Sequence, residues 1–278
     1  MVVPIGDENR PGAPTPYVNR AIVLANILVF VYMLTLSLGS LERFVFSFGA
    51  IPAEIVRGQD LYTLVTSLFI HGGWLHIIGN MIFLWVFGDN IEAAFGHGLY
   101  ALFYLVAGVL ASLSQVLVDT QSIVPSIGAS GAIAAVLGAY IVLFPGREVR
   151  VWVFPFVIWV ARVNAIVFLG VWFILQFLNG IASLGVPTAQ TGGVAFWAHI
   201  GGFVFGLIVG AVARRPISSR SAGTRPRRHH ARAEAGFRGS GYRAAVPWRL
   251  SFELGGAVEA LAEGGVPPPS PHLRSGGR

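Results

Sequence analysis

The stretch GASGAIAAVLGAYIVLFPG, residues 128–146, places a serine between glycines at the start of an apolar segment. A second stretch, Ala198-His199-Ile200-Gly201-Gly202, places a histidine near the start of another apolar segment. Polar groups inside membrane segments cost free energy, so they are functional candidates by default. The two stretches therefore predict a membrane-embedded site in which Ser130 and His199 meet.

The composition of the chain sets its class. Hydrophobic residues make up 54% of the 278 residues and charged residues only 12%, with a mean hydropathy of +0.68. A soluble domain cannot bury that much apolar surface, so we expect a multi-span membrane protein. The absence of cysteine excludes disulfide scaffolds, thiolate metal sites and a cysteine nucleophile. Much of the net charge of +6 follows Arg214 in one tail, so nucleic-acid binding is not predicted.

Apolar segments of about 20 residues cross the ~30 Å hydrocarbon core of a bilayer. The sequence predicts an all-α, polytopic bundle of six such spans: Ala21–Leu38, Trp74–Ala94, Leu99–Val118, Ser130–Pro145, Asn164–Ile181 and Val194–Ala213. No cleavable signal peptide is expected, because the first twenty residues are polar and rich in proline.

The connections between these spans differ in character. Residues 39–73 form a long first loop of mixed charge, and residues 147–163 are apolar but carry three arginines. An arginine at a span centre costs at least ~2.5 kcal/mol, so residues 147–163 are predicted to be a connection. The expected domains are an N-terminal cytoplasmic segment (1–16), a six-span core (17–213) and a tail (214–278) whose Arg, Gly, Pro and Ser content predicts disorder.

Basic residues predict the orientation of the spans. With six spans, both termini lie on one side, and most arginines of the short connections share it: Arg10, Arg20, Arg147, Arg150, Arg162, Arg214, Arg215 and Arg220. The positive-inside rule then places both termini in the cytoplasm and the first loop outside. We expect a multi-pass protein of the plasma or inner membrane, with its site opening to the extracytoplasmic side.

The second, fourth and sixth spans all begin at the extracytoplasmic face, so His76, Asn80, Ser130 and His199 are expected at one level. The fourth span is about 22 Å long from Ser130 to Phe144, so Ser130 is expected below the outer surface. Small residues predict close helix contact there: Ser130, Ala134 and Gly138 on one span, and Gly202, Gly206 and Gly210 on the other. Such contact would let His199 act as general base for Ser130.

The surroundings of Ser130 suit a developing oxyanion. Gly128 and Gly131 allow close backbone approach, and the start of a helix offers free N–H groups. His76 and Asn80 are spaced i, i+4 on one face, where either could donate. The alternative for Ser130 is an ordinary helix N-cap. A zinc site of His71, His76 and His199 is a further alternative, but no acidic residue or cysteine completes it, so no metal or cofactor is predicted.

These motifs resemble those of the rhomboid intramembrane serine proteases. The resemblance covers residues 17–213 and rests on Gly-Ala-Ser-Gly at 128–131, the His76 to Asn80 spacing, His199-Ile-Gly-Gly, and FIHGGWLHIIGNM at 69–81. It implies Ser130 as nucleophile, His199 as base and then acid, and His76, Asn80 and backbone at Gly128 and Ser130 around the oxyanion. Asp119 is not needed, since the family uses a Ser-His dyad. The implied partners are transmembrane protein substrates in the lipid bilayer; the sequence predicts no oligomeric state.

The resemblance also implies a route for substrates and two departures from the family pattern. Substrates would enter sideways near the fifth span, lined here by Phe168, Trp172 and Phe173, beneath the loop at residues 182–193. A Trp-Arg pair of some bacterial members is replaced by Tyr62-Thr63, and a tyrosine that stacks on the histidine is replaced by Ala134. Two other functions remain open: a non-catalytic binder of transmembrane clients, and a transporter, for which no internal repeat is evident.

Overall fold

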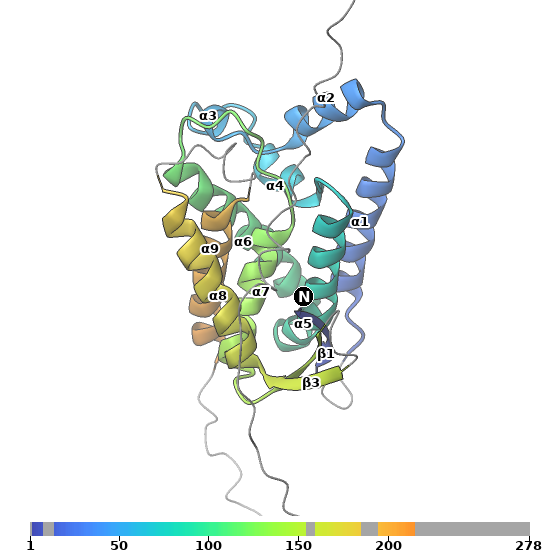
Figure 1. Ribbon diagram of the computed structural model, residues 1–278, viewed down its shortest axis with the longest axis vertical. Helices are drawn as coiled ribbons and strands as arrows, with labels where there is room; N and C mark the ends of the chain where they lie inside the picture. Colours follow the sequence, from blue (N-terminus) through green and yellow to red (C-terminus); the bar gives the residue numbers. More distant parts are fainter. Residues whose placement is uncertain (1, 8–13, 154–158, 185–193, 215–278) are drawn as a thin grey trace, which may run out of the picture.

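The computed structural model describes residues 2–7, 14–153, 159–184 and 194–214. Long helices pack side by side, with short helices at one end of the bundle and a small sheet at the other (Figure 1). In chain order the elements are β1 (Val2–Asp7), α1 (Tyr17–Leu34), α2 (Leu38–Phe48), α3 (Pro52–Ile55), α4 (Thr63–Thr66), the 3-10 helix η1 (Ser67–Phe69), α5 (Trp74–Phe95), α6 (His97–Val118), α7 (Ser130–Leu143), β2 (Glu148–Val153), β3 (Trp159–Asn164), α8 (Ala165–Ala182) and α9 (Phe196–Ala213).

Each predicted span coincides with a helix whose ends lie within four residues of the predicted ones. Among the described residues, α1, α6, α8 and α9 are each long and apolar enough to cross a membrane. Helix α5 meets the same test together with residues 63–69, from which it is bent by 95°. Helix α7 has 14 residues, about 21 Å at the rise of an α-helix, and is shorter than a hydrocarbon core. The chain is therefore a mostly helical, multi-pass membrane protein.

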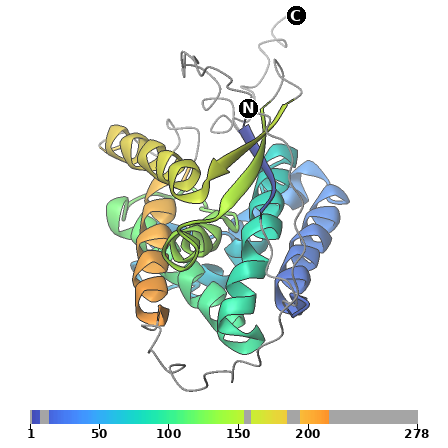
Figure 2. The same ribbon diagram turned by 90° about the horizontal axis from the view of Figure 1, so that it is seen from below.

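Helix α7 is the core of the bundle. Its residues from Gly131 to Tyr140 are all buried, and seen from below the helix stands between α5, α8 and α9 (Figure 2). Such a helix is hydrophobic on every side because no side faces water or lipid. The N-terminal end of α7, where Ser130 lies, is therefore enclosed by its neighbours.

Close contact between α7 and α9 depends on glycine. A Cβ atom added at Gly202 would lie 2.1 Å from the carbonyl oxygen of Gly131, and one at Gly206 would lie 2.0 Å from that of Ala135. The predicted glycine face of α9 is thus confirmed. On α7, the predicted contact of Gly138 is present, since a Cβ atom added there would lie 2.1 Å from the carbonyl oxygen of Phe203. Gly131, Ala135 and Ala139, which the prediction did not include, also contact α9.

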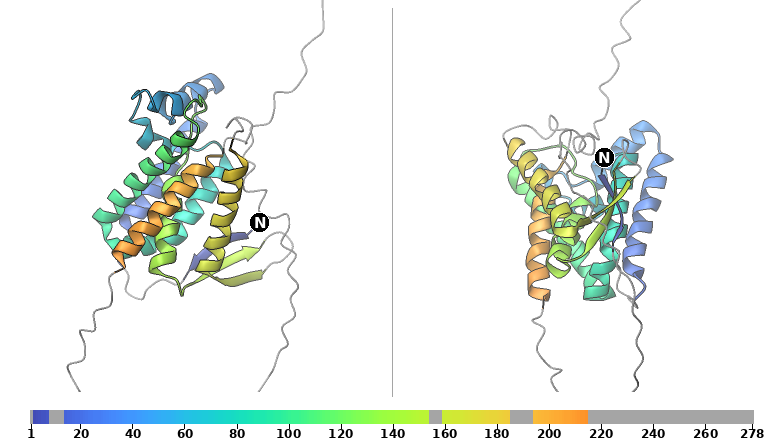
Figure 3. Two further views of the ribbon diagram at one scale, coloured as in Figure 1. Left: turned by 90° about the vertical axis from the view of Figure 1, so that its left-hand side faces the viewer. Right: turned by 60° about the horizontal axis from the view of Figure 1, so that its bottom comes forward.

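The expectation of an all-α fold is wrong in one respect. Strands β1, β2 and β3 form an antiparallel sheet in that order, below the helices (Figure 3). In β2, Val149 and Val151 are buried whereas Glu148 and Arg150 are exposed, the two-residue alternation of a half-buried strand. Residues 147–163 thus form a connection, as their arginines predict, and this connection contains most of β2 and β3, which the prediction did not include. Residues 1–16, expected to be only a segment before the core, contribute β1.

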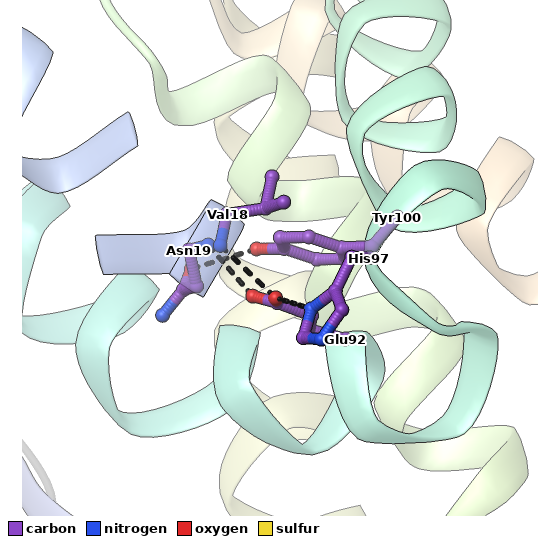
Figure 4. A network of polar contacts seen from close by, with 5 residues as sticks. All are labelled: Val18, Asn19, Glu92, His97 and Tyr100. Carbon is purple, nitrogen blue, oxygen red and sulfur yellow. Dashed lines mark hydrogen bonds and ion pairs between the residues drawn. The ribbon is translucent and has the colours of Figure 1, made fainter. Parts of the chain in front are cut away.

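A buried carboxylate joins α1 to α5 at the sheet end of the bundle. Glu92, 1% exposed, accepts hydrogen bonds from the backbone N–H groups of Val18 (3.0 Å) and Asn19 (2.7 Å) and also contacts His97 (Figure 4). Helix α1 has no side-chain N-cap of its own, so Glu92 supplies the acceptor and the negative charge that a helix N-terminus favours. The Tyr100 hydroxyl donates to Asn19 in the same network.

The predicted tail and the predicted loop at 182–193 fall mostly outside the described part of the chain. The tail at 214–278 lies outside the described residues except for Arg214, and so do residues 185–193 of the loop predicted at 182–193. The first loop is described in full and contains α2, α3, α4 and η1.

Candidate active site

Ser130 is the first residue of α7, directly after a turn made possible by Gly128. The φ angle of Gly128 is 122°, which L-residues rarely adopt. Ala129, not Ser130, occupies the N-cap position, and no side chain caps the helix. The alternative interpretation of Ser130 as an ordinary N-cap is therefore wrong, and its hydroxyl is available for other contacts.

The hydroxyl of Ser130 contacts His199 on α9. Ser130 Oγ lies 2.7 Å from His199 Nε2, within the range of a hydrogen bond between a nucleophile and its base. The two residues are 69 positions apart in the chain, and the close α7–α9 packing below them brings them together. The predicted meeting of the two side chains is present in the structure.

The other side of the imidazole is held by α8. His199 Nδ1 lies 2.8 Å from Gln176 Oε1, and the ring of Trp172 lies 6.0 Å from the imidazole, tilted by 40°. An amide oxygen only accepts hydrogen bonds, so Nδ1 carries the proton and donates a hydrogen bond to Gln176 Oε1. In the neutral ring, Nε2 then has a lone pair that accepts from the Ser130 hydroxyl.

Sequence reasoning missed Gln176 and the contact of Trp172 with His199. Trp172, expected to line a substrate entrance, packs beside His199, where Ala134 offers no aromatic ring. The sequence did offer a signal, because Gln176 is an amide within an apolar segment. It follows Trp172 by four residues, which places both side chains on the same face of a helix. Of the other two expected entrance residues, Phe168 stacks on Phe83 of α5 and Phe173 stacks on Phe203 of α9.

His76 borders the same space from α5. The backbone N–H of Gly72 donates to His76 Nδ1 (3.3 Å), so in the neutral ring the proton is on Nε2. A Cβ atom added at Gly128 would lie 2.7 Å from His76 Nε2 and 3.7 Å from Ser130 Oγ. Glycine at 128 is therefore required both for its backbone angle and for room beside the imidazole, and His76 presents an N–H donor close to Ser130.

Asn80 and the backbone N–H of Gly128, also expected near the oxyanion, already donate hydrogen bonds within the protein. Asn80 is buried, and its Nδ2 donates to the carbonyl oxygen of His76 (3.0 Å), which leaves the second amide proton for another acceptor. The backbone N–H of Gly128 donates to the carbonyl oxygen of Ser67 (2.9 Å). Gly128 thus shapes the wall of the site, and its N–H group is not free to bind an oxyanion in this structure.

The three histidines expected in the alternative zinc site do not form one. His71 is buried and packs edge-on against His76, with the ring centroids 5.0 Å apart. Across the described part of the chain, no three His, Cys, Asp or Glu side chains come together with the geometry of a metal site. His71 instead packs behind the imidazole of His76.

The positions that depart from the family pattern in the first loop make their own contacts. The Tyr62 hydroxyl donates to the carbonyl oxygen of Ser47 (2.8 Å), and Thr63 Oγ1 donates to that of Asp60 (2.7 Å). Thr66 Oγ1 reaches the carbonyl oxygen of Phe48 (2.7 Å). The bonds of Tyr62 and Thr66 connect α4 and its N-cap to the end of α2, so the loop is anchored without a Trp-Arg pair.

Comparison with known proteins identifies the family of the chain. The family model of the Rhomboid domain matches residues 58–216, which include α5 to α9 and every residue of the candidate site. The chain belongs to the rhomboid family. It is 29% identical over 164 residues to RHOMBOID-like protein 5 of Arabidopsis thaliana, covering 59% of this rhomboid and 48% of the relative.

Two further relatives come from other organisms. Rhomboid protein 1, mitochondrial, of Saccharomyces cerevisiae is 32% identical over 153 residues, 53% of this rhomboid and 40% of the yeast protein. Rhomboid protease GluP of Bacillus subtilis is 32% identical over 118 residues, 42% of this rhomboid and 22% of GluP. The rhomboid described here thus spans less than half the length of these relatives.

Proposed function

We propose that this rhomboid is an intramembrane serine endopeptidase that hydrolyses peptide bonds in or next to transmembrane segments of other proteins. The observation that carries the proposal is the 2.7 Å contact between Ser130 Oγ and His199 Nε2, with the proton of the imidazole directed to Gln176 on the other side. A serine in hydrogen-bond contact with an oriented, neutral imidazole is the arrangement that activates the hydroxyl as a nucleophile.

The proposed reaction has two stages. As Ser130 Oγ attacks the scissile carbonyl carbon, His199 Nε2 takes the hydroxyl proton and then gives it to the leaving amine, so an acyl-enzyme ester remains on Ser130. Water attacks the ester, His199 takes a proton from that water, and the proton returns to Ser130 Oγ as the ester bond breaks. His76 Nε2–H, the second Asn80 amide proton and the Ser130 backbone N–H stabilise the oxyanion in both stages.

The location of the dyad supports a transmembrane substrate. Ser130 begins a helix that is too short to cross a hydrocarbon core and is enclosed by longer helices, so the reaction would occur below the membrane surface. We propose six spans, counting α5 and the short α7, within a core at residues 17–213. The arginines between α7 and α8 and after α9 support cytoplasmic termini and an extracytoplasmic site opening.

The expectation of the plasma membrane has no support from the relatives, since the yeast protein is named mitochondrial. We propose lateral entry of the substrate beside α8, past Phe168 and Phe173 at its contacts with α5 and α9.

Cleavage of a tagged single-span substrate in membranes tests the proposal. The wild-type protein should produce two fragments, and Ser130→Ala and His199→Ala should each abolish them, because members of a catalytic pair act as a unit. Undiminished cleavage by Ser130→Ala would refute the assignment. Capture of the intact substrate by the wild-type protein without any cleavage would favour a non-catalytic binder of transmembrane clients.

A further inference from the structure

Helix α8 carries both groups that contact the imidazole of His199 from the side opposite Ser130. Trp172 and Gln176 are spaced i, i+4, so they lie on one face of α8, one turn apart. The other supporting helix, α7, places Ala134 where the family pattern has an aromatic ring. The orientation of His199 therefore depends on a helix that contains neither member of the dyad.

The polar contact made by α8 matches one state of the imidazole. Gln176 Oε1 is a hydrogen-bond acceptor at 2.8 Å from His199 Nδ1, and it cannot donate to a ring nitrogen. It therefore favours the tautomer with the proton on Nδ1 and the lone pair on Nε2, which faces Ser130 Oγ at 2.7 Å. The opposite tautomer would place an N–H on the serine side, and the Gln176 amide would have to turn over so that its N–H donates to Nδ1.

Trp172 restricts the same ring by packing. Its ring centroid lies 6.0 Å from that of His199 and 6.1 Å from that of Phe203, so the indole fills the space between α8 and the first two turns of α9. Rotation of the imidazole toward α8 would run into the indole. Packing and hydrogen bonding thus limit the ring to the orientation that reaches Ser130.

Helix α8 is also the least enclosed of the spanning helices. Only 17% of its apolar 18-residue stretch is buried inside the molecule, compared with 39% of the corresponding stretches of α6 and α9. It is held against α9 by the stacked rings of Phe173 and Phe203, 4.4 Å apart, and by the close approach of Gly180 to Ile200. The bond between Gln176 and His199 therefore crosses the contact between an exposed helix and the helix that carries the base.

We infer that Gln176 is a positioning residue for His199: its side-chain oxygen fixes the tautomer and orientation in which the imidazole accepts the Ser130 proton, and it does so only while α8 is packed on α9. The inference rests on the proposed function, because it assigns Gln176 a part in that reaction. Gln176 itself exchanges no proton with a substrate.

The test compares variants of the full chain by the rate at which a fluorophosphonate probe labels Ser130 over a range of pH. Gln176→Leu removes the acceptor at similar volume, and labelling should slow at least about tenfold, the effect of losing one oriented hydrogen bond. Gln176→Met, which is similar in length and flexible, should slow labelling to the same extent. Asn179→Leu removes an exposed amide from the same helix and should label at the wild-type rate.

Gln176→Glu separates positioning from packing. A carboxylate at 176 again accepts from Nδ1 and also stabilises the imidazolium, so labelling should recover and its acidic limb should move to higher pH. Labelling of Gln176→Leu and Gln176→Met at the wild-type rate would overturn the inference alone. So would a Gln176→Glu variant that labels as slowly as Gln176→Leu, with an unshifted limb. Failure of the wild-type protein to label would instead overturn the proposed function, and this inference with it.

Discussion

Gly206→Ala tests whether the glycine contact between α7 and α9 sets the geometry of the dyad. The added methyl carbon would lie 2.0 Å from the carbonyl oxygen of Ala135, a backbone atom that cannot turn away. An ordinary van der Waals contact requires roughly 3.5 Å, so the helices must separate by about 1.5 Å at this level. Gly206 is seven residues from His199, about 10 Å along the helix, so the methyl group touches neither member of the dyad.

Separation of this size would stretch the Ser130–His199 contact well beyond its present 2.7 Å. A misplacement of about 1 Å can cost roughly 100-fold in rate, and we expect a loss of that order in the rate of fluorophosphonate labelling. Overpacking should also lower the free energy of unfolding by about 1–3 kcal/mol, measurable as a lower thermal midpoint in detergent.

Gly170→Ala is the matched control. It adds the same methyl group to α8, where a Cβ atom would meet nothing within 4 Å. Since alanine favours a helix over glycine, this variant should be as stable as the wild-type protein or slightly more so, and should label at the wild-type rate. The reasoning is refuted if Gly206→Ala labels at the same rate as Gly170→Ala.

Three further predictions concern other parts of the molecule. Gly128→Ala should slow labelling strongly, because it forces the turn before Ser130 into a disfavoured φ and displaces His76; a wild-type rate would contradict the assigned geometry. Glu92→Gln should lower the free energy of unfolding, measured by thermal melts, by about 1–3 kcal/mol, because the amide nitrogen would present a donor to the N–H groups of α1. Glu42→Gln, at an exposed position, should change the free energy of unfolding little. Burial raises the pKa of Asp7, so docking of β1 should be strongest at pH values below the ordinary pKa of Asp and should weaken as pH rises through the raised pKa. Hydrogen exchange of the β1 amides, corrected for intrinsic rates, should show this trend, and Asp7→Asn should abolish it.

The long helices could be predicted because their information is local. Apolar runs near 20 residues, bounded by glycine, proline and arginine, gave helix ends within four residues of those observed. The glycine face of α9 was also readable, since residues 202, 206 and 210 repeat every four positions on one side of a helix. The contact between Ser130 and His199 followed from the shared level of the helix starts and from these small residues.

What the sequence did not reveal depends on long-range partners. Strand β1 has no amphipathic signature of its own, and it pairs with β2 more than 140 residues away. Glu92 looks like an ordinary charge near a helix end until α1 places its backbone N–H groups against it. Gln176 meets His199 only because α8 packs on α9, and no local pattern specifies which face of α8 does so.

The central claim, that Ser130 is a nucleophile activated by His199, is tested most directly by locating the probe after fluorophosphonate labelling. Peptide mass spectrometry of the labelled wild-type protein should find the adduct on Ser130, with none there in Ser130→Ala and little in His199→Ala. An adduct on a different serine, or equal labelling of Ser130 with and without His199, would contradict the account.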